Sequence, residues 1–158
     1  MPKIHPFLWF DTQAEEAANF YVSVFPNSKV LSVMRNPPGA PGPEGAAMTV
    51  DFQLDGFRVA GLNGGPHFNF TEATSFFIEC QDQAEVDYYW DKLVEGGGKA
   101  SQCGWLKDRF GFSWQVVPRQ LFETLGGPDA EGRKRAMAAM MQMTKLDIAK
   151  LRAAYAGE

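Results

Sequence analysis

Few residues of this 158-residue sequence have the types and the spacing that chemistry requires. The two histidines, His5 and His67, have no serine or cysteine nucleophile at a motif spacing. The two cysteines, Cys80 and Cys103, form no CxxC pair and are not followed by ligand-spaced histidine or cysteine, which argues against a zinc site. Nucleophilic catalysis and a structural zinc are therefore not indicated.

The remaining polar candidates lie in the stretch Gln102–Pro118, QCGWLKDRFGFSWQVVP. It predicts two apolar strands, each with a tryptophan, joined by a hairpin turn. The turn contains Asp108 and Arg109, which we expect to pair with one another or with solvent. Gln115 follows the turn on the second strand, where a buried amide would need a hydrogen-bond partner.

Composition and charge limit the classes of function. A net charge of −4 argues against a protein that follows nucleic-acid phosphates, which needs clustered lysine and arginine. A hydrophobic content of 45% is ordinary for a globular chain that buries a core without disulfides. The first residues lead into an apolar run too short for a signal peptide or a membrane span. We expect a cytoplasmic protein that contacts neither nucleic acid nor membrane.

The first half of the chain predicts one helix among several strands. Thr12 and Glu15 have the spacing of a capping box, and apolar residues follow at helical spacing as far as Phe25. Clean alternation of apolar and polar residues predicts a half-buried strand that turns back at Asp55-Gly56. The expected strands are His5–Phe10, Lys29–Met34, Ala47–Leu54 and Phe57–Leu62.

The second half follows the same order before a different tail begins. Asp82 and Glu85 again predict a capped helix, which Gly96-Gly97-Gly98 ends. The expected strands are Ser75–Cys80, Lys99–Leu106 and Phe112–Val117. The tail predicts a helix from Pro128-Asp129 with methionines on its apolar stripe, and then a last helix; methionine suits adaptable packing surfaces.

A shift of 70 residues aligns the two halves. Phe7-Leu8 falls on Phe77-Ile78, and the tripeptide Gln13-Ala14-Glu15 falls on Gln83-Ala84-Glu85. The order of strand, capped helix and strands is the same on both sides of this match. Duplication of one module explains this pattern better than coincidence does.

Several motifs spread over nearly the whole chain, including its methionine-rich tail, occur together in one known family. They are Pro6–Asp11, Gln13–Ala17, Phe20-Tyr21, Phe25–Ser28, Leu62–Pro66, Gln102–Gly111 and Ser113–Pro118. With them the sequence resembles the vicinal oxygen chelate superfamily of glyoxalase I, bleomycin-resistance proteins and extradiol dioxygenases. Within it the resemblance is to the PhnB-like branch, which often carries the name 3-demethylubiquinone-9 3-methyltransferase.

The resemblance implies an α+β fold of tandem βαβββ modules, like that of the glyoxalase, bleomycin resistance and dihydroxybiphenyl dioxygenase proteins, with C-terminal helices. The modules would be residues 1–66 and 67–120, and the helical extension residues 121–158, within one compact domain. The resemblance also implies a homodimer, in which modules can be exchanged between subunits so that each cleft uses residues from both chains.

Glyoxalase-like members of the superfamily hold a divalent metal with four side chains, from the first and last strands of each module. Carried across by position, these fall on His5 and Ser75 in the first strands and on Ala60 and Gln115 in the last strands. Alanine offers no donor, and serine and glutamine are weak neutral ligands. We therefore expect no metal cofactor, with His5 and Gln115 as the weak candidates if one is bound.

Three functions remain open. The first is a small-molecule binding protein that uses the superfamily cleft without its metal. The second is a lyase, isomerase or dioxygenase with a metal held through His5, Gln115 and further donors. The third is the methyltransferase of the family name, which is disfavoured because no glycine-rich turn follows the first strand. Aromatic and polar candidates for the cleft are His5, Trp9, Phe52, Asn63, Trp105, Trp114 and Gln115.

Overall fold

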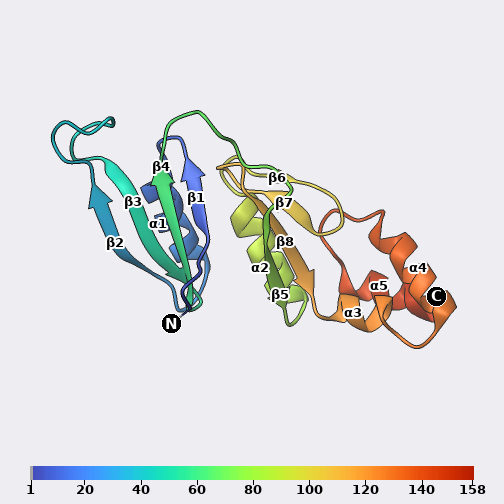
Figure 1. Cartoon of the computed structure of the whole chain (residues 1–158). Helices are drawn as coiled ribbons and strands as arrows, with labels where there is room; N and C mark the ends of the chain where they lie inside the picture. The colour runs from blue at the N-terminus through green and yellow to red at the C-terminus, as the bar shows by residue number, and fades with distance from the viewer. Residues whose placement is uncertain (1) are drawn as a thin grey trace. The chain divides into compact units, whose positions relative to one another are not determined.

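The protein consists of two compact units, each built on its own four-stranded sheet (Figure 1). The computed structural model describes residues 2–158. The first unit ends at Phe70, and the second unit is Thr71–Glu158. The C-terminal helices therefore belong to the second unit. No helix among the described residues is long and apolar enough to cross a bilayer.

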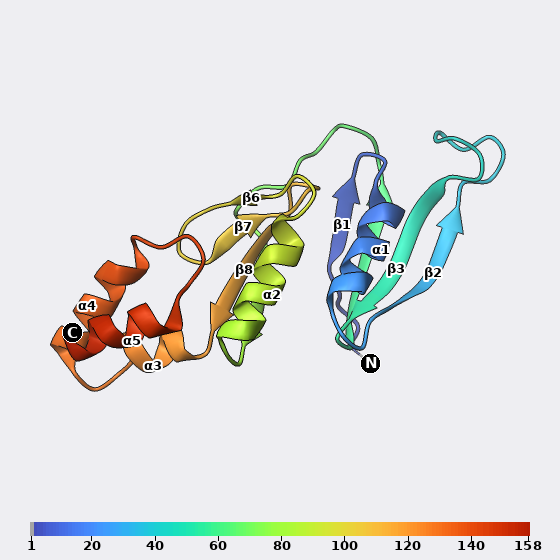
Figure 2. The ribbon, with the colours of Figure 1, turned by 180° about the vertical axis from the view of Figure 1, so that it is seen from behind.

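The first unit contains a mixed sheet with one helix on it. Its elements are β1 (Phe7–Phe10), α1 (Ala14–Val24), β2 (Lys29–Arg35), β3 (Ala47–Leu54) and β4 (Phe57–Asn63). The strand order is β1-β4-β3-β2, with β1 parallel to β4 and the other neighbours antiparallel. Helix α1 covers one face of this first sheet, as Figure 2 shows. Its buried Tyr21 packs on Phe52 of β3, with 6.2 Å between ring centroids.

The expected capping box at the start of α1 is wrong. The N-cap is Gln13, and it makes no side-chain cap hydrogen bond. Instead, Asn63 at the end of β4 accepts a hydrogen bond from the Ala14 backbone N–H at 2.8 Å. An amide from the neighbouring strand thus satisfies a free donor of the first helical turn, which removes the need for a threonine cap.

The second unit repeats the first. Its elements begin with β5 (Ser75–Cys80), α2 (Gln83–Val94), β6 (Lys99–Ala100), β7 (Trp105–Lys107) and β8 (Ser113–Pro118). The strand order β5-β8-β7-β6 matches that of the first sheet, with β5 parallel to β8. Asp82 caps α2 as predicted, accepting a hydrogen bond from the Glu85 backbone N–H at 2.9 Å. The internal repeat is confirmed in this common order of elements.

The expected single strand Lys99–Leu106 is wrong, because the chain turns back within it. Strands β6 and β7 are antiparallel neighbours. Between them Cys103 and Gly104 have φ values of +57° and +84°, which an extended strand does not allow. Backbone hydrogen bonds from Cys103 to Met143 and from Gly104 to Thr144, both 2.8 Å, hold this turn against the C-terminal part of the chain.

Three helices complete the second unit: α3 (Gln120–Leu125), α4 (Ala130–Met140) and α5 (Ile148–Ala156). Their shared core is Val117, Leu121, Leu146 and Leu151, against which Leu125, Met140 and Met143 pack. The methionines of the predicted stripe differ in their roles, since Met137 and Met141 are 45% and 51% exposed. The tail also contacts α2, because Gln83 donates to the Leu146 carbonyl and accepts from the Ile148 N–H.

Candidate functional site

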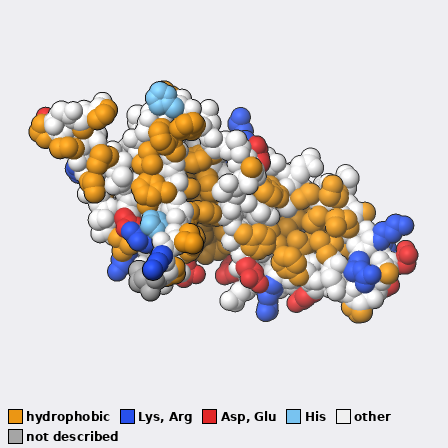
Figure 3. Space-filling view, in the orientation of Figure 1, with side chains coloured by type: hydrophobic (Ala, Val, Ile, Leu, Met, Phe, Trp, Pro, Cys, Tyr) orange, Lys and Arg blue, Asp and Glu red, His pale blue; other side chains and the backbone are white. Residues whose placement is uncertain are grey.

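Each sheet has one helix-covered face and one open face. Strand alternation places Phe7 and Trp9 of β1, with Ala60 and Leu62 of β4, on the open face of the first sheet. Figure 3 shows hydrophobic side chains gathered over these strands on that face. Phe7 is 52% exposed there. The open faces are therefore where a ligand or a partner can reach the sheets.

The positions that the resemblance assigned to metal ligands lie on or directly beside paired strands within each unit. In the first unit, Ala60 donates its backbone N–H to the Pro6 carbonyl at 3.0 Å, next to His5. In the second unit, the Gln115 amide donates to the Ser75 hydroxyl at 2.9 Å. Gln115 is half-buried, and the partner that its amide needs is this serine.

The side chains at these four positions do not fit a divalent metal. They supply one imidazole, one hydroxyl and one amide, and Ala60 supplies no donor. The amide and the hydroxyl already bond to each other. Within residues 2–158, no group of three or more histidine, cysteine, aspartate or glutamate side chains is placed to hold a metal ion.

Two of the expected cleft aromatics, Phe52 and Trp114, lie on the helix-covered faces of their sheets. Phe52 is 1% exposed and packs on α1 through Tyr21. Trp114 is 2% exposed and packs edge-on against Phe76 and Phe112. In this structure both side chains support a sheet from behind and do not reach its open face.

Two other candidates of the first unit hold local structure. Asn63 accepts from the Ala14 N–H and donates to the Ala47 carbonyl at 3.0 Å, so its amide joins a helix to a strand. The Trp9 indole donates to the Gly65 carbonyl at 2.9 Å, and its ring meets Phe68 edge-on with 4.9 Å between centroids. Trp9 remains half-buried on the open face, whereas the polar atoms of Asn63 are engaged.

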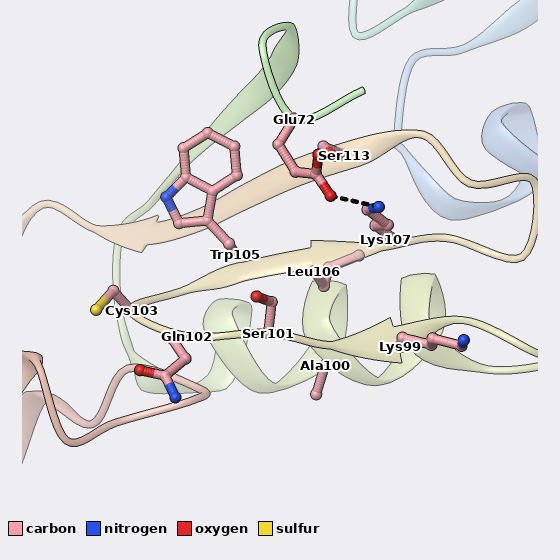
Figure 4. Close-up of a pocket in the computed structure, with 10 residues that line it drawn as sticks. All are labelled: Glu72, Lys99, Ala100, Ser101, Gln102, Cys103, Trp105, Leu106, Lys107 and Ser113. Carbon is pink, nitrogen blue, oxygen red and sulfur yellow. Dashed lines mark ion pairs between the residues drawn. The ribbon is translucent and has the colours of Figure 1, made fainter. Parts of the chain in front are cut away.

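The remaining aromatic candidate, Trp105, lines a pocket in the second unit (Figure 4). We call it the second-sheet pocket. Its volume is about 570 Å³, and its exposed lining is mainly apolar. This volume is typical of small-molecule sites. The lining residues are Glu72, Lys99, Ala100, Ser101, Gln102, Cys103, Trp105, Leu106, Lys107 and Ser113.

A row of polar side chains crosses the second sheet beside Trp105. Strand register places Lys99 opposite Lys107, Lys107 opposite Ser113, and Ser113 opposite Ser75. Directly opposed residues of neighbouring strands share a face of the sheet. We call these four residues the lysine–serine row. Figure 4 shows the Glu72 carboxylate extending over the sheet to form an ion pair with Lys107.

Sequence reasoning missed the lysine–serine row, although one signal was present. Lys107 and Ser113 flank the hairpin turn at equal distance from its centre, so a hairpin there places them opposite each other. Glu72 has no such signal, because it lies in an irregular segment before β5. Lys99 lies opposite Lys107 because the chain turns back between β6 and β7, a turn that the sequence did not predict.

The expectation that Asp108 pairs with solvent is wrong, because its side chain is buried in the hairpin. Asp108 is 3% exposed, and its carboxylate accepts hydrogen bonds inside the turn. The donors are the backbone N–H groups of Phe110 and Phe112, at 2.9 and 3.1 Å, and the indole of Trp114, at 2.8 Å. A buried carboxylate needs such donors. Asp108 therefore fixes the turn that positions Lys107 and Ser113.

In the second unit, the pKa values of Glu72 at the pocket and of Cys80 at the end of β5 are displaced. The hydrogen bond from Lys107 lowers the pKa of the Glu72 carboxyl, which favours the charged form. Burial raises the pKa of the Cys80 thiol to about 12, and the side chain is fully buried. Cys103 is a second free thiol, half-buried at the pocket wall. Its Sγ lies 3.9 Å from the Met141 sulfur.

The chain is similar to one described sequence family and to several solved structures. The sequence model of the family described as 3-demethylubiquinone-9 3-methyltransferase matches residues 2–117. The likeness expected for the tail is therefore not part of this match. The chain is 33% identical to a putative 3-demethylubiquinone-9 3-methyltransferase, PhnB protein, from Bacillus cereus. That match has a TM-score of 0.69 and covers 74% of this chain and 99% of the other.

More distant structures share the fold. The fosfomycin resistance protein FosX from Listeria monocytogenes, in complex with Mn(II) and sulfate, has a TM-score of 0.54 at 15% identity, covering 80% of this chain and 98% of that chain. A glyoxalase/bleomycin resistance protein from Albidiferax ferrireducens has a TM-score of 0.50 at 11% identity, covering 73% and 96%. No curated protein matches the sequence. The chain belongs to the PhnB-like family described as 3-demethylubiquinone-9 3-methyltransferase, whose fold is that of the glyoxalase/bleomycin resistance superfamily.

Proposed function

We propose that this protein binds a small molecule in the second-sheet pocket without the metal that other superfamily members use. The observation that carries the proposal is the pocket itself, a cavity of about 570 Å³ with a half-buried tryptophan, a mainly apolar exposed lining and a few polar groups. Sites for small ligands combine these features. Trp105 supplies the aromatic wall, and Gln115 lies directly opposite it on β8.

Binding without metal is supported by the donor chemistry of the open faces. His5 offers a single imidazole, and Gln115 and Ser75 bond to each other. The Mn(II) in the FosX structure belongs to that protein, and a similar role here would require donors beyond His5 and Gln115. The test is metal analysis of protein purified without a polyhistidine tag, beside a His5→Ala variant. Stoichiometric metal that is lost in the variant would favour the metal-dependent lyase, isomerase or dioxygenase.

Methyl transfer, as in the family description, has less support from the residues. The common enzymes that use S-adenosylmethionine place a glycine-rich turn after the first strand of a parallel sheet. Here β1 leads into Asp11-Thr12-Gln13, without glycine, and the sheets are mixed. Calorimetric titration with S-adenosylmethionine tests this alternative. We expect no heat of binding, and a saturable isotherm would restore it.

We also propose that a second copy of the chain covers the open face of the first sheet, which makes the protein a homodimer. Phe7 is 52% exposed on this face, and the edge-strand residue Met34 is 58% exposed. These two residues lie on opposite edge strands, and Figure 3 shows hydrophobic side chains gathered over the face of the sheet. An exposed apolar patch of this kind marks an interaction surface. Exchange of modules between the two copies is one form that this dimer can take. Light scattering should give twice the chain mass for the wild type and a monomer for Phe7→Ser; a monomeric wild type at micromolar concentration would contradict the proposal.

The unpaired cysteines are consistent with a reducing compartment, and we propose the cytoplasm. Cys80 and Cys103 are both free, and Cys80 is fully buried. Disulfides are rare where glutathione and thioredoxin keep thiols reduced. Fractionation of cells that produce the untagged protein is the test, and recovery outside the cytoplasmic fraction would contradict this placement.

A further inference from the structure

We infer that the second-sheet pocket takes a small carboxylate with a flat apolar body, and that the ligand carboxylate replaces Glu72 at Lys107. This inference rests on the proposed function and names the chemical class of its ligand. It is drawn from the charges of the lining, one unpartnered hydroxyl, the position of Glu72 and the indole beside them.

The lining has a surplus of positive charge. Lys99 and Lys107 lie opposite each other on β6 and β7, and Glu72 is the single acidic residue among the lining residues. The chain as a whole has a net charge of −4. Two neighbouring lysines repel each other unless an anion lies between or beside them. A ligand anion at this place relieves that repulsion more fully than one glutamate does.

A buried hydroxyl next to Lys107 has no partner. Ser113 lies opposite Lys107 on β8 and is 1% exposed. Its Oγ has no hydrogen-bond partner within the described part of the chain. Buried polar groups are nearly always satisfied, so an unpaired hydroxyl in a pocket lining points to a missing acceptor. A carboxylate bound to Lys107 would have a second oxygen available to accept this hydroxyl.

Glu72 already shows that a carboxylate can occupy this place. It belongs to the irregular segment before β5 and forms an ion pair with Lys107 over the sheet (Figure 4). Its side chain is 64% exposed, and that of Lys107 is 39% exposed. Exposed ion pairs are weak, so a ligand that adds apolar contact can displace this one. Glu72 then acts as an internal competitor for the carboxylate site.

The apolar part of the ligand would lie against Trp105. Figure 4 shows the indole and the Glu72 side chain on the same side of the sheet, whereas Leu106, between Trp105 and Lys107 on β7, shares the helix-covered face with Trp114. A flat ring gains stacking and apolar contact on an indole face. The distance from the indole to Lys107 is two residues along one strand, which suits a fused bicyclic ring with one carboxylate.

The experiment is calorimetric titration of the full-length protein with 2-naphthoate and with its neutral analogue 2-naphthamide. We expect 2-naphthoate to bind at least roughly tenfold more tightly than the amide, which is typical of a hydrogen bond to a charged group. Lys107→Met should remove this preference. Glu72→Gln should raise the affinity for 2-naphthoate, because the competitor no longer carries a charge.

Two further variants make the result specific. Ser113→Ala should weaken 2-naphthoate binding by about tenfold, as expected when a charged acceptor loses a hydroxyl donor. Lys145→Met is the matched control, because Lys145 forms another exposed ion pair, with Asp87, outside this pocket; it should change nothing. Equal affinities for acid and amide, or weaker binding by Glu72→Gln, would overturn the carboxylate inference alone. Failure of both probes to bind would overturn the proposed function as well.

Discussion

The buried carboxylate of Asp108 accepts three hydrogen bonds within the hairpin between β7 and β8. It is 3% exposed and accepts from two backbone N–H groups and from the indole of Trp114. Phe112 and Trp114 are themselves buried, at 1% and 2% exposure. The substitution Asp108→Ala leaves these donors without an acceptor in a place that water does not reach.

The magnitude follows from the buried donors. The Phe112 N–H and the Trp114 indole each lose a hydrogen bond to a charged acceptor, and each loss costs about 1.5–2 kcal/mol. The Phe110 N–H lies nearer to solvent and can find water. We therefore expect Asp108→Ala to lower the free energy of unfolding by about 3–4 kcal/mol. Asp108→Asn keeps one acceptor oxygen and should cost roughly half as much.

Urea denaturation followed by far-UV circular dichroism measures this loss. Asp91→Ala is the matched control, because Asp91 is an exposed aspartate on α2, and it should stay within about 0.5 kcal/mol of the wild type. A double-mutant cycle of Asp108→Asn with Trp114→Phe should give a coupling energy of about 1–2 kcal/mol. A loss below about 1 kcal/mol for Asp108→Ala would refute the reasoning, because it would mean that the buried donors find other acceptors.

Three further predictions concern the thiols, the tail and the ion pair. Burial raises the pKa of Cys80 to about 12, so only one thiol per native chain should react rapidly with Ellman's reagent at pH 8. Cys103→Ser should abolish this rapid reaction. Two rapidly reacting thiols in the wild type would contradict the prediction. Gln83 makes two hydrogen bonds to the chain at the start of α5, so Gln83→Ala should lower the free energy of unfolding by about 1–2 kcal/mol. Amide hydrogen exchange in α5 should also become faster. Unchanged exchange would contradict the inference that Gln83 holds α5 in place. The hydrogen bond from Lys107 lowers the pKa of Glu72, so the stabilisation by this pair is present above the ordinary carboxyl pKa and is lost as the pH falls through the lowered pKa. Carboxyl NMR titration should show a higher pKa of Glu72 in Lys107→Met than in the wild type. An unchanged pKa would contradict the pairing.

The architecture could be predicted because it depends on local patterns that occur twice. The alternation in Ala47–Leu54 and the cap at Asp82 are visible in the sequence, and the structure contains both. Features that depend on distant partners could not be predicted. The first helix is capped by Asn63 from β4, and the turn at Cys103 is held by Met143 and Thr144 of the tail. No local pattern reports such a partner.

The sheet face on which each candidate residue lies could be predicted less well for the same reason. Trp105 and Gln115 lie on the open face of the second sheet, but Phe52 and Trp114 lie on the helix-covered sides. A large aromatic residue at a strand position fits either face, and only the register decides between them. Lys107 and Ser113 become a pair only when the hairpin is in register, which is why the lysine–serine row was not seen in the sequence.

The most direct test of the central claim is a titration of untagged, chelator-treated protein with 2-naphthoate, beside a Trp105→Ala variant. We predict one binding site per chain without added metal. The affinity of Trp105→Ala should fall by roughly tenfold or more, because stacked aromatic contact and apolar burial are lost together. Binding that appears only after a divalent metal is added, or that is unchanged in Trp105→Ala, would contradict a metal-free ligand site in the second-sheet pocket.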